Sequence, residues 1–277
     1  MSTNTIEALI DTASAPDSAF ARHLERVDLE HRTPAALAEV PDPRTSPTYT
    51  FLSSDRVIES LRSAGFVPVS AAQTRSRRSN PLSARHVIRF RRRYETVELR
   101  DCIPEILFIN GHDGRTATQF RLALYRPICK NGLIVCEETL PVWRVPHRGG
   151  ILDEVVAAAI RQSEQFAAVG QWVERMGRTL LEQEQRLDFA KDAISLRFAK
   201  KRPEGMEPAQ LLEARRDEDR GHDLWTTYNV VQEHVIKGGV AYRLGPNRQM
   251  HSRGIRGIRE DVRLNTELWR MATARVT

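Results

Sequence analysis

The 277-residue sequence is poor in several kinds of residue, and each scarcity excludes a class of protein. Three cysteines are too few, and odd in number, for a disulfide scaffold, so they favour a reducing compartment and a cytoplasmic protein. No run of about 18 apolar residues is present, which predicts no transmembrane helix and no membrane partner. The N-terminal segment lacks the basic start and the apolar stretch of a secretory signal.

Known catalytic and cofactor-binding motifs are also absent. The sequence contains no Walker loop, no GxGxxG, no GxSxG and no HExxH. His112, Asp113 and His147 have no standard metal-site spacing, and turn chemistry is the simpler interpretation of His112 and Asp113. Glu233 lies among polar residues of a predicted helix, where a buried polar network is favoured over catalysis. We therefore expect no metal and no cofactor, and we favour a non-catalytic protein.

Positive charge is abundant and unevenly placed. Lysine and arginine total 42 against 36 aspartates and glutamates, and 37 of the 42 are arginine. Residues 75–100 hold nine arginines and two glutamates, while residues 242–277 hold eight arginines and three acidic residues. Segregated charge of this kind is typical of a phosphate-facing surface. A codon-composition bias toward arginine is the competing explanation.

The clearest β pattern lies between residues 103 and 136. An apolar run over 106–109 is broken at 110–114 by Asn-Gly and Asp-Gly, which favour turns. The return arm alternates, with Arg121, Ala123 and Tyr125 facing away from an apolar set, and this predicts a half-buried strand. That apolar set is Phe120, Leu122 and Leu124. A second turn at 130–132 precedes a third strand.

Helices and a basic strand flank this region. Ser53 and Gly65 are the predicted N-cap and end of one helix. Residues 85–94 are predicted to form a strand in which arginines alternate with other residues. Further helices are predicted from residue 151 onward and over residues 187–198, 208–216, 223–236 and 255–269. A basic loop at 243–253 precedes the last of these helices.

This order of elements predicts an α+β fold: an antiparallel β-meander packed against a long helix, followed by a helical C-terminal region. We expect a flexible N-terminal arm over 1–48, an α+β core domain over 49–200, and a helical region over 201–277 packed on the core.

Two motifs and a C-terminal pattern resemble a known family. FINGHDG at 108–114 and YRPICKNGL at 125–133 are similar to segments of the phage/plasmid-like protein family, also known as domain of unknown function 932. LWTTYNVVQE at 224–233, Gly238-Gly239 and DVRLN at 261–265 follow the family's C-terminal pattern, although Gly111 and Arg115 stand where serine is commoner. The resemblance implies a protein of a phage, plasmid or bacterial mobile element, and it implies no activity.

A weaker similarity exists at the level of fold. A helix, a basic strand, a β-meander and a long helix resemble the core of single-strand annealing recombinases of the RecT, Redβ and Erf-like groups. Those proteins form rings or filaments and hold the DNA backbone in a basic groove. The resemblance implies a homo-oligomer that binds single-stranded DNA and promotes annealing in recombination, although fold alone does not specify function.

Arginines are the predicted phosphate ligands, because salt-dependent backbone contacts need only fixed positive charge. Tyr94 or Tyr125 is a candidate for base stacking. Two alternatives stay open: an enzyme acting on nucleotides or a modified base through His112, Asp113 and Glu233, and an interaction protein, such as a host-defence inhibitor, with a basic face. The candidate arginines are Arg75, Arg77, Arg78, Arg89, Arg91 and Arg93, followed by Arg253, Arg256 and Arg259.

Overall fold

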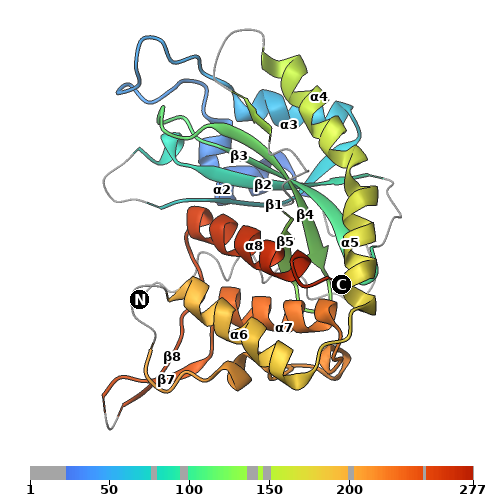
Figure 1. The fold of residues 1–277 in the computed structure, drawn as a ribbon. Helices are drawn as coiled ribbons and strands as arrows, with labels where there is room; N and C mark the ends of the chain where they lie inside the picture. The colour runs from blue at the N-terminus through green and yellow to red at the C-terminus, as the bar shows by residue number, and fades with distance from the viewer. Residues whose placement is uncertain are drawn as a thin grey trace. The chain divides into compact units, whose positions relative to one another are not determined.

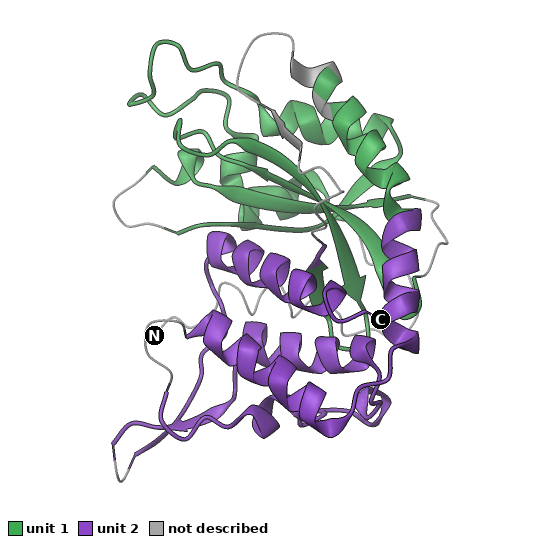
Figure 2. Ribbon diagram, viewed as in Figure 1, with its two compact units in different colours: residues 1–133, 139–166 green, residues 134–138, 167–277 purple. Residues whose placement is uncertain are grey.

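A computed structural model describes residues 23–75, 80–93, 99–135, 143–145, 151–198, 203–245 and 248–276. The chain forms two compact units, one of residues 1–133 and 139–166 and the other of residues 134–138 and 167–277 (Figure 2). The fold is α+β, as the sequence predicts, with an antiparallel sheet in the first unit and helices in the second (Figure 1). The expected arm, core domain and C-terminal region, with limits near residues 48 and 200, stay a prediction.

The sheet of the first unit is a meander whose strands follow one another in chain order. Strands β1 to β4 pair antiparallel with their neighbours, and β6 pairs antiparallel with β4. The predicted turn between β3 and β4 contains Gly114 at φ +69°, a backbone conformation that glycine adopts without strain. The strands are β1 (Phe66–Gln73), β2 (His86–Arg92), β3 (Ile103–Asn110), β4 (Thr118–Arg126), β5 (Asn131–Ile134) and β6 (Trp143–Val145).

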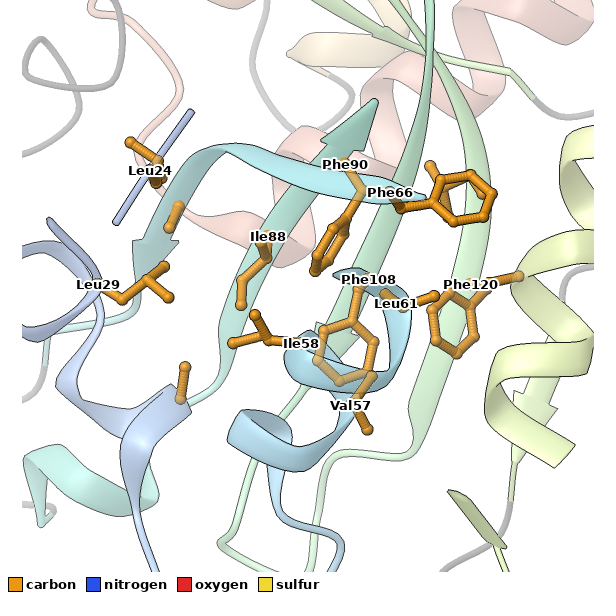
Figure 3. Close-up of a cluster of buried hydrophobic side chains, with 14 of the residues drawn as sticks. Leu24, Leu29, Val57, Ile58, Leu61, Phe66, Ile88, Phe90, Phe108 and Phe120 are labelled. Atoms are coloured by element: carbon orange, nitrogen blue, oxygen red, sulfur yellow. The ribbon is translucent and has the colours of Figure 1, made fainter. Parts of the chain in front are cut away.

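Helices α3 (Ser54–Ser63) and α4 (Ile151–Glu164) pack on this sheet. The Ser53 side chain accepts a hydrogen bond from the Arg56 N–H, which confirms the predicted N-cap of α3. Apolar residues of α3 meet aromatic residues of the strands in a buried cluster (Figure 3), in which the rings of Phe108 and Phe120 stack at 5.2 Å. Helix α2 (Arg26–Arg32) and the 3₁₀ helix η1 (Pro34–Leu37) add Leu29 and Ala36 to this core.

Two local predictions differ from the structure. Strand β4 is not half-buried, because Arg121 and Ala123 are buried along with the apolar residues of the opposite face. Strands buried on both faces lose the simple alternation on which that prediction depends. The helical pattern after residue 151 is also divided, since α4 ends at Glu164 and α5 (Phe166–Arg178) begins two residues later.

The second unit is built on helices α6 (Gln183–Arg197), α7 (Leu224–Lys237) and α8 (Ile258–Thr273), which contact one another. The Asp223 side chain caps α7, and the rings of Trp225, Tyr228 and Trp269 pack together between α7 and α8. A helix predicted from residue 208 is instead the 3₁₀ helix η3 (Pro208–Leu212), followed by η4 (Asp217–Asp219). Among the described residues, no helix is long and apolar enough to span a membrane.

The predicted basic loop at 243–253 contains a small hairpin that the sequence did not reveal. Strand β7 (Ala241–Arg243) pairs antiparallel with β8 (Gln249–His251). Strands of three residues are too short to show a period-2 pattern. The available signal was the Leu-Gly-Pro-Asn run at 244–247, whose Gly and Asn favour turns.

His86, in β2, is enclosed in the first unit. Its ring nitrogens lie 2.7 Å from the Ser54 Oγ and 2.9 Å from the Ala84 carbonyl oxygen, and no part of the residue is exposed. Burial lowers the pKa of His86 to about 4, although the hydrogen bond to Ala84 partly opposes this shift. The folded protein therefore keeps this imidazole neutral at pH values at which an exposed histidine is charged.

We expect acid to destabilise the first unit through His86. Between about pH 6.5 and pH 4 the unfolded chain binds a proton that the folded state excludes, so stability falls by up to about 3 kcal/mol as the pH drops through this window. Urea unfolding followed by circular dichroism over this range measures the loss. His86→Gln keeps hydrogen-bonding groups and removes the titration, so its stability should vary less with pH. An equally steep loss in the variant would assign the acid sensitivity to other groups.

Candidate nucleic-acid interface

The arginines placed first by the sequence do not form one surface among the described residues. Arg75 follows β1 and Arg93 follows β2, and both side chains are exposed. Because Gln73 pairs with His86 while Phe66 pairs with Arg92, these arginines lie at opposite ends of the strand pair. The two pairs are seven residues apart along β1, so the arginines beyond them are separated by more than about 20 Å. Arg77, Arg78 and Tyr94 fall outside the described residues.

Arg89 and Arg91 are held inside the first unit by Glu105. The Glu105 Oε2 accepts from Arg89 Nη1 at 2.8 Å, and its Oε1 accepts from Arg91 Nε at 2.8 Å. The side chains are 14%, 9% and 1% exposed for Arg89, Arg91 and Glu105. Arg89 and Arg91 do share one face of β2, as predicted, but that face is covered and its charge is partly neutralised.

Neighbouring residues pack closely around the triad formed by Arg89, Glu105 and Arg91. A Cβ on Gly132 would lie 2.3 Å from Arg89 Nη2, so glycine leaves the space that the guanidinium occupies. The Arg91 guanidinium carbon lies 4.6 Å from the centre of the Tyr125 ring, within cation–π range. Burial raises the pKa of Tyr125. Tyr125 therefore has a packing role here, and base stacking by it stays a prediction.

A second arginine cluster has a different environment. Residues 243–259, here named the basic segment, contain five arginines and no aspartate or glutamate. All five side chains are exposed, and none is ion-paired with a carboxylate of the described residues. This segment keeps its positive charge available to a ligand. The five are Arg243, Arg248, Arg253, Arg256 and Arg259.

Two glycines fix the backbone of the basic segment against the end of α7. Gly238, at φ +78°, is the C-cap of α7, and a Cβ there would lie 2.4 Å from the Ser252 carbonyl oxygen. Gly239 N–H donates to Ser252 O at 2.8 Å, Ser252 N–H donates to Val240 O at 2.8 Å, and Ile255 N–H donates to Ile236 O at 2.8 Å. The close approach requires glycine, and it holds the chain on either side of Arg253.

Arg197, at the end of α6, ties the same region together. Its guanidinium donates to the carbonyl oxygens of His234 and Val235 in the last turn of α7, and to that of Arg253. Burial lowers the pKa of Arg197 to about 10, which still leaves it charged at neutral pH. Arg197 thus caps α7 and positions Arg253 without offering its own charge to solvent.

The hairpin and the start of α8 carry the other arginines. Arg243 N–H donates to Glu204 O at 2.7 Å, and Leu244 N–H donates to Arg248 O at 2.8 Å, which closes the β7–β8 loop. Arg259 lies in the first turn of α8, where unpaired backbone N–H groups also favour anions. Glu260 in that turn is paired with Arg263 at 2.6 Å, so it does not neutralise the basic segment.

The residues of the enzymatic alternative are engaged in local structure. Asp113 Oδ1 accepts from the Arg115 N–H at 2.9 Å, which is turn chemistry. Burial raises the pKa of Glu233, but hydrogen bonds from Arg216 and the charge of Lys237 outweigh it and hold the pKa below its usual value. A general base works best with a pKa near the working pH, so this carboxylate is a weak candidate. Asp113 belongs to the first unit and Glu233 to the second.

His112, Asp113 and His147 are the side chains that the sequence offers as metal ligands. Within the part of the chain that the structure describes, no three histidine, cysteine, aspartate or glutamate side chains are grouped as metal ligands. His147 lies outside that part.

Comparisons with known proteins give a consistent answer. The family model described as "Domain of unknown function (DUF932)" matches residues 44–269. Two Escherichia coli (strain K12) proteins, "UPF0380 protein YafZ" and "UPF0380 protein YfjQ", are each 35% identical over 257 residues, which cover 92% of this chain and 93% of each relative. No solved structure matches the chain. The resemblance to single-strand annealing recombinases is therefore not confirmed.

Proposed function

The chain belongs to the DUF932 family, and we propose that it binds single-stranded DNA through the basic segment. In this proposal the protein acts as an oligomer that promotes strand annealing during recombination of a mobile element. The observation that carries the proposal is the exposed, carboxylate-free set of five arginines on a fixed backbone.

Arginine clusters of this kind attract a phosphate backbone without reading its sequence. Each contact releases counterions from the nucleic acid, which makes the affinity strongly dependent on salt. Arg89 and Arg91 of β2 lack this property, because Glu105 already supplies their counter-charge. Arg253, Arg256 and Arg259 therefore support the proposal better than Arg89 and Arg91 do.

We expect the triple variant Arg253→Ala, Arg256→Ala, Arg259→Ala to bind an oligothymidine more weakly and with less salt dependence. If each arginine contacts one phosphate of a single strand, the slope of log affinity against log salt falls in magnitude by about 2. When salt rises from about 50 to about 200 mM, the affinity of the variant should therefore fall by a factor roughly 15-fold smaller than the factor for the wild type. Fluorescence anisotropy of a labelled strand measures both quantities.

A matched control removes three arginines that already have partners. Arg220, Arg270 and Arg275 of the same unit pair with Asp217, Glu267 and Asp192. Their replacement by alanine changes the net charge of the protein equally and should leave the slope nearly unchanged. Equal effects of the two triple variants would assign binding to net charge and contradict a local site.

Annealing and oligomeric state are separate tests of the same proposal. Wild-type protein should speed the pairing of complementary strands and show a multiple of the 31.6 kDa chain mass by light scattering. Absence of binding to single-stranded DNA at low salt would refute the proposed function. Salt-sensitive binding without faster pairing of the strands would support the proposed DNA binding and contradict the proposed annealing activity. Tighter binding to duplex than to single strands would contradict the strand preference.

A further inference from the structure

The β7–β8 hairpin carries apolar side chains among the arginines of the basic segment. Tyr242 lies directly opposite Met250 in the strand pair. Opposed residues of an antiparallel pair share one face, so the ring and the thioether form a small apolar surface. Leu244, which follows β7, is 55% exposed. A ligand with both apolar and charged parts would fit this arrangement of apolar groups beside arginines.

Single-stranded nucleic acid is such a ligand. Its bases present flat apolar faces and its backbone presents a negative charge at every nucleotide, and proteins bind it with aromatic platforms beside basic grooves. A duplex hides those base faces in its own stacks. The basic segment has five arginines and no acidic residue, so its charge complements a negatively charged backbone. It would not complement an apolar protein surface without acidic residues.

We propose that Tyr242 stacks on a base of the bound strand, with Met250 and Leu244 making apolar contacts to the same or a neighbouring base. This proposal rests on the proposed function and deepens it, because it assigns base contacts to the hairpin and phosphate contacts to the arginines. It also supplies a physical reason for preferring single strands: the ring can reach only unpaired bases.

The backbone next to Tyr242 is held by hydrogen bonds that do not involve the tyrosine side chain. Arg243 N–H donates to Glu204 O on one side of β7, and Leu244 N–H donates to Arg248 O across the loop. Both are backbone bonds, so a change of the Tyr242 side chain leaves them in place. Tyr242 is half-buried, and Leu244, Gly245 and Arg248 beyond it are exposed.

The test compares an oligothymidine with an abasic strand of equal length, which keeps the phosphates and lacks the bases. Wild-type protein should bind oligothymidine at least about fivefold more tightly, the value of one stacked base. Tyr242→Phe should keep that ratio and Tyr242→Leu should lower it by about fivefold or more. Neither variant should change the salt slope, because the phosphate contacts remain.

The outcomes separate the two proposals. Binding of neither strand by the wild type would refute DNA binding itself. Equal, salt-dependent binding of both strands would keep DNA binding and overturn stacking by Tyr242. An unchanged ratio in Tyr242→Leu would also overturn it. If Tyr242→Leu lowers the melting temperature, the exposed Leu244→Ser substitution takes its place and should lower the ratio by a smaller factor, and an unchanged ratio there would count against the proposal.

Discussion

Replacing Glu105 with glutamine is expected to lower the free energy of unfolding of the first unit by about 3–5 kcal/mol. The carboxylate is 1% exposed and accepts one hydrogen bond from each of two mostly buried guanidiniums. Glutamine has nearly the same shape, but it removes the negative charge and leaves Arg89 and Arg91 together without compensation. Urea unfolding measures the global loss, and amide hydrogen exchange of β2 and β3 measures it locally.

The control for this variant is the same chemical change at an exposed pair. Glu59 lies 3.7 Å from Arg62 in α3, and its side chain is 62% exposed. Glu59→Gln should change the stability by less than about 0.5 kcal/mol, since solvent already screens that pair. If Glu105→Gln were as mild as Glu59→Gln, the stability of the sheet would not depend on the pairing of Arg89 and Arg91 with this carboxylate.

Replacing Glu233 with glutamine should destabilise the second unit by about 3 kcal/mol. Arg216 Nη2 donates to both carboxylate oxygens, at 2.6 and 2.7 Å, and Lys237 Nζ donates to one of them at 3.2 Å. We expect the lower end of the range for buried pairs because Arg216 and Lys237 are 21% and 20% exposed. Fluorescence of Trp225 and Trp269, which are buried in this unit, reports its unfolding.

The pH dependence of this variant follows from the lowered pKa of Glu233. The unfolded carboxylate takes up its proton near pH 4.3, about where a free glutamate titrates, while the folded one stays ionised to lower pH. The stabilisation is complete above that value and is lost as the pH falls through the folded pKa, so the wild type and Glu233→Gln should converge in acid. Glu267→Gln, at the exposed pair with Arg270, is the matched control and should show little difference at any pH.

Together these variants distinguish two uses of arginine in one chain. Arg89 and Arg91 stabilise the sheet by meeting Glu105, so their loss should affect folding before binding. Arg253, Arg256 and Arg259 meet no carboxylate of the described residues, so their loss should affect binding before folding. A binding defect without a change in stability is therefore the expected mark of the interface.

Local signals accounted for much of the fold. Ser53 caps α3 and Asp223 caps α7, and the turn residues after Asn110 separate β3 from β4. These features depend on residues within a few positions of each other, which is why the sequence predicts them. The hairpin β7–β8 was missed because its strands are three residues long, and the break at Gln165 was missed because the apolar period continues through it.

By itself the sequence determined the α+β order of elements, the family and the two regions where arginines concentrate, because each is a property of composition or of short-range pattern. Only the tertiary structure decided which arginines keep their charge. Arg89 and Arg91 are neutralised by a carboxylate 16 and 14 residues away, and that pairing follows from the register of β2 against β3. The five arginines of the basic segment are exposed and meet no carboxylate of the described residues, an outcome that depends on contacts distant in sequence and that no local pattern of residues predicts.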